Sequence, residues 1–167
     1  MRKRYYYIGV IPFLYCCLLY ISGCGQSKPP SCVIDVDGTL FNFKRPASPV
    51  LGALETIKWI KSREITIVYL SARTTDRREE TEWILQKWDF PSGRLILKED
   101  PDEESSLYKT REIRSLQEQY NVLFGVGDKD TDLIAYTACG ITDFFVDGDW
   151  DAVRVRIEEY LEEIGLD

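Results

Sequence analysis

From residue 32 to the end of the chain, short apolar segments alternate with longer amphipathic ones, and this alternation constrains the fold more than any other feature. The short segments are rich in β-branched and aromatic residues, as at 65–70, and have the length of strands. The longer segments carry apolar residues at helical spacing, as at Val50, Leu54 and Ile57. Strands are predicted at 32–36, 65–70, 95–97, 122–126 and 144–146, and helices at 49–61, 76–88, 107–120, 130–139 and 152–164. Strands that alternate with helices favour an α/β fold, in which helices cover both faces of a central parallel sheet.

A sheet of this kind binds ligands at the carboxyl ends of its strands, so the residues that follow the strands are the candidates for chemistry. Histidine is absent from the 167 residues, which excludes Ser-His-Asp triads, histidine phosphatases and zinc sites built on histidine. Acids, bases and metal ligands must therefore come from carboxylates, hydroxyls, lysine and the backbone.

Two carboxylates, Asp35 and Asp37, directly follow the first predicted strand and are separated by one residue. In an extended chain both side chains project to the same side. Two ionised carboxylates at this spacing repel each other unless a cation lies between them, and Mg²⁺ prefers hard oxygen ligands. Gly38 permits a sharp exit from the strand and a close approach of the backbone to an anion. For two acids taken alone, an acidic loop that merely ends a strand would be the more usual explanation of the pattern.

Residues 35–40, Asp-Val-Asp-Gly-Thr-Leu, resemble the first motif of the haloacid dehalogenase superfamily, and three further motifs follow in order. Ser71 matches the hydroxyl residue of the second motif. Residues 127–132, Gly-Asp-Lys-Asp-Thr-Asp, resemble the fourth motif. For the lysine of the third motif, Lys109 in a Tyr-Lys pair is similar to an element of bacterial acid phosphatases in this superfamily, and Lys98 is the competing candidate.

The resemblance implies a Rossmann-like three-layer sandwich and a Mg²⁺-dependent phosphatase. In this family Asp35 would attack phosphorus to form an aspartyl-phosphate, and Asp37 would protonate the leaving oxygen and then activate water. The metal would be held by Asp35, by the backbone carbonyl of Asp37 and by Asp128. Ser71 and Lys109 would bind the phosphoryl group. The two remaining assignments stay open: Asp132 binds the metal or orients the lysine, and Arg73 binds substrate phosphate or pairs with a surface carboxylate.

The intervals between the motifs leave no room for a cap domain. Only 33 residues separate Asp37 from Ser71, and 37 separate Ser71 from Lys109. A short flap at 41–48, together with helices and strands, accounts for both intervals. The sequence therefore predicts a capless enzyme with an open site, where Lys44 and Arg45 of the flap supply positive charge.

The chain begins with three basic residues at 2–4 and an uncharged apolar run at 5–21, which is the order of a secretory signal. The run ends in Ser-Gly-Cys at 22–24, which resembles the lipobox of bacterial lipoproteins and predicts lipidation of Cys24. The predicted organisation is a signal peptide at 1–23, a tether at 24–31 and a hydrolase domain at 32–167. This organisation predicts a membrane-anchored protein of the cell envelope; an uncleaved anchor and an ordinary secretory signal are the alternatives.

Without residues 1–23 the chain keeps 18 basic and 28 acidic residues, a formal net charge of −10, which disfavours nucleic acid as a partner. The expected partner is a phosphorylated substrate, small or macromolecular, and neither its identity nor the oligomeric state follows from the sequence. A non-catalytic lipoprotein that uses the fold for binding, and a phosphatase specific for polynucleotides or lipids, are the alternative functions. Cys32 and Cys139 remain in the domain as free thiols or as a disulfide.

Overall fold

The structure is a computed structural model and describes residues 27–42 and 48–166. The predicted signal peptide, Cys24, and the flap residues Lys44 and Arg45 lie outside the described residues.

Five parallel strands form the central sheet, which confirms the predicted fold class. They are β1 (Pro30–Ile34), β4 (Thr66–Thr74), β5 (Arg94–Lys98), β6 (Asn121–Gly127) and β7 (Thr142–Phe145), in the order β5-β4-β1-β6-β7. Two short strands, β2 (Phe41–Asn42) and β3 (Ser48–Pro49), pair antiparallel apart from this sheet. The helices are α1 (Ala53–Ser62), α2 (Arg78–Lys87), α3 (Ser105–Gln119), α4 (Asp130–Ala138) and α5 (Trp150–Glu163), and a 3₁₀ turn, η1 (Thr75–Arg77), precedes α2.

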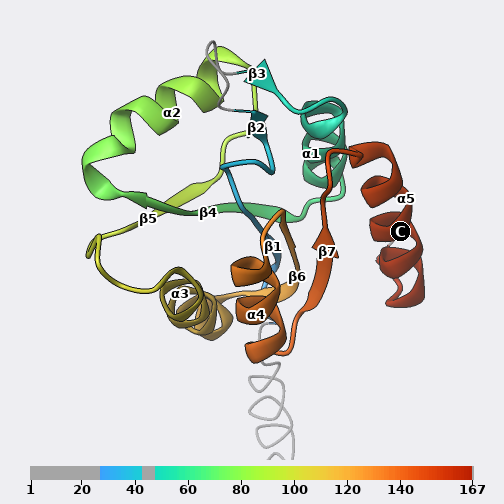
Figure 1. The fold of residues 1–167 in the computed structure, drawn as a ribbon. Coiled ribbons are helices and arrows are strands. Elements are labelled where there is room, and N and C mark those ends of the chain that lie inside the picture. Colours follow the sequence, from blue (N-terminus) through green and yellow to red (C-terminus); the bar gives the residue numbers. More distant parts are fainter. Residues whose placement is uncertain (1–26, 43–47, 167) are drawn as a thin grey trace, which may run out of the picture.

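Helices cover both faces of the sheet and complete a three-layer sandwich (Figure 1). On one face α1, α2 and α5 bury residues such as Ile57, Ile84 and Ile157 against the strands. On the other face α3 and α4 bury residues such as Ile113 and Tyr136. Because both faces are covered, the central strands are buried along most of their length, as β4 shows. No cap domain is present among the residues that the structure describes.

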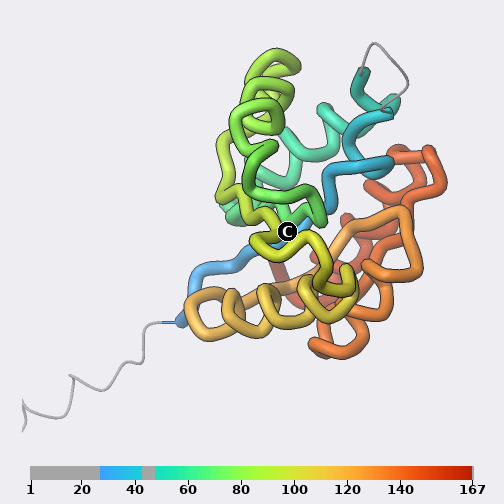
Figure 2. The backbone as a smooth tube through the Cα atoms, turned by 60° about the vertical axis from the view of Figure 1, so that its left-hand side comes forward, coloured from blue at the N-terminus to red at the C-terminus, as the bar shows by residue number. Residues whose placement is uncertain are grey.

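The order of the strands reverses at β1, which is therefore the topological switch point of the sheet. After β1 the chain adds β4 and β5 on one side of it, and then crosses to add β6 and β7 on the other. In Figure 2 the chain enters the domain at one end of β1, and the β2–β3 hairpin lies at the opposite end. The carboxyl end of β1, between β4 and β6, is therefore the place where an open α/β sheet binds its ligand.

Most element boundaries differ from the sequence-based prediction by one or two residues, and three differences bear on the site. The sheet begins at Pro30, two residues inside the predicted tether, because 30–31 pair with 121–122 of β6. The first helix begins at Ala53 instead of 49, since Pro49 pairs with Phe41 and Gly52 takes a positive φ of 79°. The strand β4 continues to Thr74, so that the second motif lies within the strand and not after it.

Cys32 and Cys139 are free thiols on opposite faces of the sheet. Burial raises the pKa of both thiols, which keeps them protonated and weakly reactive. No helix within 27–42 and 48–166 combines the length and the apolar character needed to span a bilayer.

Candidate active site

Asp35 is the first residue after β1, and its buried carboxylate binds a buried lysine. Its backbone N–H donates to the Val126 carbonyl of β6 at 2.9 Å, which fixes the residue where the two central strands end. The Lys109 ammonium donates to Asp35 Oδ1 at 2.5 Å, and only 4% and 3% of the Asp35 and Lys109 side chains are exposed. Burial raises the pKa of the Asp35 carboxyl to about 6, although Lys109 opposes the shift. At neutral pH Asp35 is therefore an ionised carboxylate with one oxygen held by a cation.

Asp132 completes this buried cluster from the first turn of α4. Its Oδ1 accepts a hydrogen bond from Lys109, and its Oδ2 accepts one from the Lys129 backbone N–H at 3.2 Å. Burial alone would lower the pKa of Lys109, but the carboxylates of Asp35 and Asp132 together raise it. Asp132 therefore contacts the lysine, as one of the two roles left open for it requires, and its other role, as a metal ligand, stays a prediction.

A divalent metal fits between the carboxylates at this edge of the sheet. Oxygens of Asp35, Asp128 and Asp132 lie within 4.8 Å of one another. The Thr39 hydroxyl lies between two of them, 3.1 Å from Asp35 Oδ2 and 3.0 Å from Asp128 Oδ1. At Gly38, φ is 92° and an added Cβ would lie 2.0 Å from Asp128 Oδ2, so glycine is required there. A set of oxygen donors held this close suits Mg²⁺.

Asp37 stands apart from this cluster. The Arg73 guanidinium binds both of its oxygens, with Nε at 2.8 Å from Oδ2 and Nη2 at 2.9 Å from Oδ1. The Ser71 hydroxyl donates to Oδ2 at 3.0 Å. The Asp37 side chain is 30% exposed, whereas the Arg73 side chain is only 3% exposed. The Asp37 side chain is therefore not one of the converging carboxylates, and a role in metal binding through its backbone carbonyl stays a prediction.

The structure places the two candidate lysines and Arg73 in distinct surroundings. Lys109 lies between Asp35 and Asp132, whereas Lys98 is the buried last residue of β5 and donates to the carbonyls of Pro101 and Glu103, each at 2.8 Å. Arg73 pairs with a carboxylate, as one alternative proposed, but the partner belongs to the first motif and is not a surface acid.

Thr39 was given no role by the sequence reasoning, although it lies inside the first motif. It connects Asp35 to Asp128 through its hydroxyl, and its carbonyl accepts a hydrogen bond from Trp150 Nε1 at 2.8 Å. Its position between a glycine and a buried leucine was the available signal, because a small hydroxyl residue there can reach both strand ends.

An open cleft of about 750 Å³ adjoins Asp37 and Asp128. Its lining comes from the loop after β1, from the β2–β3 hairpin and the residue after it, from the loop after β6 and from the end of β7 with the loop that follows, namely Asp37, Gly38, Phe41, Asn42, Val50, Asp128, Lys129, Phe145, Val146, Asp147 and Gly148. The Phe145 side chain is partly exposed in it. The cleft gives a substrate access to the carboxylates from solvent.

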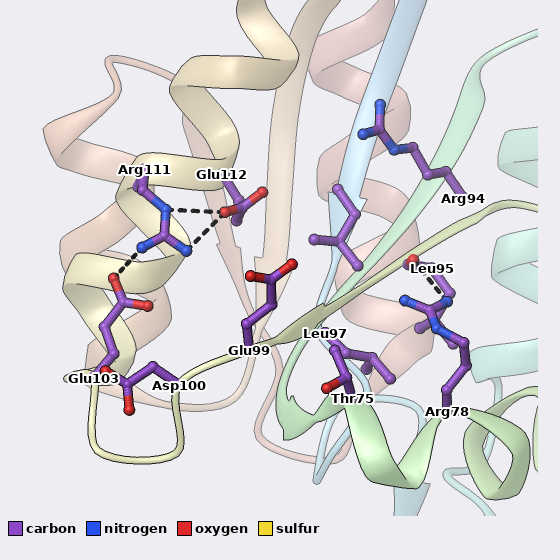
Figure 3. A pocket seen from close by; sticks show the side chains of 11 residues that line it. Thr75, Arg78, Arg94, Leu95, Leu97, Glu99, Asp100, Glu103, Arg111 and Glu112 are labelled. Atoms are coloured by element: carbon purple, nitrogen blue, oxygen red, sulfur yellow. Dashed lines mark hydrogen bonds and ion pairs between the residues drawn. The ribbon is translucent and has the colours of Figure 1, made fainter.

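A second hollow, of about 510 Å³, lies beside the edge strand β5 (Figure 3). It contains none of the carboxylates described above. Arg111, on its α3 side, is already paired with Glu103 and Glu112. The positive charge on the α3 side of this hollow is therefore balanced by neighbouring carboxylates.

Comparison with known proteins agrees with this geometry. Residues 41–146 match the family model of HAD superfamily, subfamily IIIB (acid phosphatase), a range that begins just after Asp37. No curated protein matches the chain.

Solved structures share the fold. A chain of the Pnkp1/Rnl/Hen1 RNA repair complex has a TM-score of 0.64 and 22% identity, with 72% of this chain and 43% of that chain covered, so this chain spans less than half of that protein. A HAD-like phosphatase from Mesorhizobium loti has a TM-score of 0.61 and 13% identity, with 80% and 88% covered. The cobalt-bound deoxy-D-mannose-octulosonate 8-phosphate phosphatase from Haemophilus influenzae has a TM-score of 0.52 and 18% identity, with 83% and 90% covered.

The family match covers more than half of the chain, and the fold and the acidic strand ends agree with it. The chain therefore belongs to subfamily IIIB of the haloacid dehalogenase superfamily, the acid phosphatases.

Proposed function

We propose that the protein hydrolyses phosphomonoesters in a Mg²⁺-dependent reaction through a phosphorylated Asp35. The observation that carries the proposal is the buried contact of Lys109 with Asp35 and Asp132, close to the Asp128 carboxylate. A lysine held by two acids keeps its charge, so it can balance the charge of a phosphoryl group as well as the nucleophile.

In the first step an Asp35 oxygen forms a bond to phosphorus as the ester P–O bond breaks, and the leaving oxygen takes a proton from Asp37. In the second step water attacks phosphorus and gives its proton to Asp37, the P–O bond to Asp35 breaks, and phosphate leaves. Both steps need Asp35 and Asp37 on opposite sides of the phosphoryl group. The separation of the two side chains, one on Lys109 and the other on Arg73, supports this division of roles.

Asp35 and Asp128 would hold the metal, with Asp132 beside them. Held there, the metal would supply positive charge that offsets the negative charge of the phosphoryl oxygens. Ser71 and Lys109 approach the same phosphoryl group from the β4 and α3 sides. The cobalt in the Haemophilus influenzae phosphatase belongs to that protein, and here it supports only the choice of a divalent ion.

We further propose that Cys24 is lipidated and anchors the domain to an envelope membrane. The domain is entered at Pro30, at the amino end of β1, while Asp35 follows its carboxyl end about 16 Å away, taking ~3.3 Å per residue. Lys28 and Pro29 bind Gln117 and Asn121 through hydrogen bonds at that amino end. A membrane attached through this segment would face the end of the sheet opposite to the site. This orientation favours soluble phosphoesters over lipids of the anchoring leaflet.

The catalytic proposal is tested with the purified domain after removal of metal by chelator. Hydrolysis of an aryl phosphate should be absent, return with Mg²⁺, and remain low in Asp128→Asn at the same Mg²⁺ concentration. Asp130→Asn, an exposed acid in the same segment, is the control and should respond as wild type. Full activity in excess chelator would overturn the metal dependence.

The anchoring proposal is tested in whole cells with a fatty-acid analogue that can be labelled after incorporation. Wild type should carry the label and fractionate with membranes, and Cys24→Ser should do neither. A mature N-terminus at another residue, or label that persists in Cys24→Ser, would refute the anchor without bearing on catalysis.

A further inference from the structure

The Arg73 guanidinium forms a hydrogen bond with Thr81 of α2 in addition to its contacts with Asp37. Its Nη1 donates to Thr81 Oγ1 at 3.1 Å, and the same hydroxyl donates to the Arg77 carbonyl at 2.8 Å. Thr81 is buried at 1% exposure, in the first turns of the helix that follows the second motif. A hydroxyl that donates its only proton to a carbonyl presents its lone pairs in a fixed direction. The guanidinium of Arg73 is therefore oriented by a rigid helix and not by solvent.

The other side of the guanidinium holds Asp37 at two points. A planar guanidinium that binds both oxygens of a carboxylate fixes its direction as well as its position. Ser71 makes only a single hydrogen bond to the same carboxylate. A phosphoryl group that binds Ser71 can displace this single contact, whereas the pair with Arg73 keeps its support from Thr81.

We propose that Thr81 and Arg73 form a positioning chain that aims Asp37 at the water that attacks phosphorylated Asp35. This inference rests on the proposed function and deepens it, because it assigns Arg73 to Asp37 and not to the substrate phosphate. Thr81 does not touch the substrate and acts through Arg73. An error of about 1 Å in the place of a catalytic group can cost as much as 100-fold in rate, so loss of this backing should be measurable.

The test uses Thr81→Val, which keeps shape and removes the hydroxyl, and Thr81→Ser, which restores it. Thr56→Val is the matched control, because the Thr56 hydroxyl is also buried in a helix but has no hydrogen-bond partner among the described residues. Each variant is given Mg²⁺ and an activated aryl phosphate, whose leaving group needs no proton. Rapid acid quenching followed by intact-mass analysis measures the fraction of enzyme phosphorylated at Asp35.

In Thr81→Val we expect breakdown of the phosphorylated enzyme to slow about tenfold, so that the phosphorylated fraction rises. Because kcat/KM reports only the steps up to leaving-group release, it should stay within twofold, while kcat and KM fall together. Thr81→Ser and Thr56→Val should behave as wild type. A raised KM with a lower kcat/KM would instead make Arg73 a phosphate ligand and overturn the proposal, as would unchanged kinetics in Thr81→Val.

A crystal structure of Thr81→Val separates this proposal from the function on which it rests. The guanidinium should move off Asp37, and an unchanged pair would overturn the positioning role whatever the kinetics show. A wild type that neither turns over aryl phosphates nor becomes phosphorylated would refute the proposed function, and the structure would still decide the claim about Thr81.

Discussion

The two carboxylates that end β1 lie only two residues apart, yet their surroundings differ in almost every respect. Asp35 is buried on the β6 side, where Lys109, Asp128 and Asp132 surround it. Asp37 lies on the β4 side, 30% exposed, between an arginine and a serine hydroxyl and at the edge of an open cleft.

This difference separates two chemical tasks. The buried side gives a nucleophile a fixed direction, excludes water, and concentrates charge where a phosphoryl group would sit. The open side lets a proton-transferring group reach the leaving oxygen and then a water molecule. The Asp35 side should therefore tolerate almost no substitution, while changes on the Asp37 side should affect single steps.

The largest effect should come from Asp35→Asn, which keeps the size of the side chain and removes the nucleophile. We expect kcat/KM for an aryl phosphate to fall at least about 10³-fold. Asp147→Asn, an exposed acid that lines the cleft, should stay within about twofold of wild type in the same assay. Activity of Asp35→Asn near that of wild type would remove the distinction between the two sides.

Lys109→Met should lower kcat/KM by about 10²–10³-fold, because a phosphoryl group would then meet Asp35 without a compensating charge. It should also destabilise the metal-free protein by about 3–5 kcal/mol, since two buried carboxylates lose their partner. Lys98→Met is the matched control, a buried lysine whose loss should lower stability and spare catalysis. Denaturant unfolding and steady-state kinetics of both variants decide the assignment. An equal loss of activity in folded Lys98→Met would contradict it.

On the open side, Asp37→Asn should slow turnover of an activated aryl phosphate about 10²-fold and still allow the phosphorylated enzyme to form. The amide cannot accept the proton of the attacking water, so the second step slows while the first proceeds. Mass spectrometry after acid quench should find phosphate on Asp35 in this variant. If formation and hydrolysis of the phosphorylated enzyme were both unaffected, and no phosphate were trapped on Asp35, Asp37 would not be the proton-transferring group.

Removal of the metal should lower the free energy of unfolding, because the carboxylates on the buried side then repel one another. Repulsion among Asp35, Asp128 and Asp132 is relieved by a divalent cation, so Mg²⁺ at ten times its dissociation constant should raise the free energy of unfolding by about 1.4 kcal/mol. Thermal unfolding in Mg²⁺ and in chelator measures this shift. Asp128→Asn should reduce it, and Asp37→Asn, whose carboxylate lies apart on Arg73, should retain most of it. If Asp128→Asn and Asp37→Asn reduced the stabilisation by Mg²⁺ equally, the metal would have to lie between the Asp35 side and the Asp37 side of the site.

The sequence predicted the strand ends well because the chemistry there is local. Asp35 and Asp37 follow one strand, and the acids at 128 and 132 follow another. Both strands are apolar enough to be identified from the sequence. The order of strands in a parallel sheet then brings such ends together. The lysine of the third motif lies in a helix and follows no such rule, so Lys98 stayed a competitor until the structure placed Lys109 against Asp35. The prediction of a capless fold succeeded for a similar reason, since chain length between motifs limits what can be inserted.

Sequence reasoning failed where a side chain finds its partner through the third dimension. Nothing in the sequence indicates that Arg73 turns toward Asp37, or that its guanidinium also binds a threonine eight residues further along, one turn into α2. The sequence also did not indicate that Asp35 and Asp37 have different surroundings. Asp35 contacts a lysine of α3, whereas Asp37 contacts an arginine that is bound to a threonine of α2. The early start of β1 at Pro30 likewise depends on its pairing with β6.

The smallest effect should come from the wall of the open cleft. Phe145 is 39% exposed and lines the cleft beside Asp37 and Asp128 without a hydrogen bond to either. Contact of its ring with an aryl leaving group adds a modest apolar and stacking contribution, so Phe145→Ser should raise KM for aryl phosphates about threefold and leave kcat unchanged. Leu51→Ser is the control, since Leu51 is 87% exposed and does not line the cleft. Steady-state kinetics on an aryl and an alkyl phosphate separate the outcomes, because loss of a ring contact should weaken only the aryl ester. A tenfold fall in kcat for both esters would mean that this wall sets the position of Asp37, and the open side would then be as exacting as the buried one.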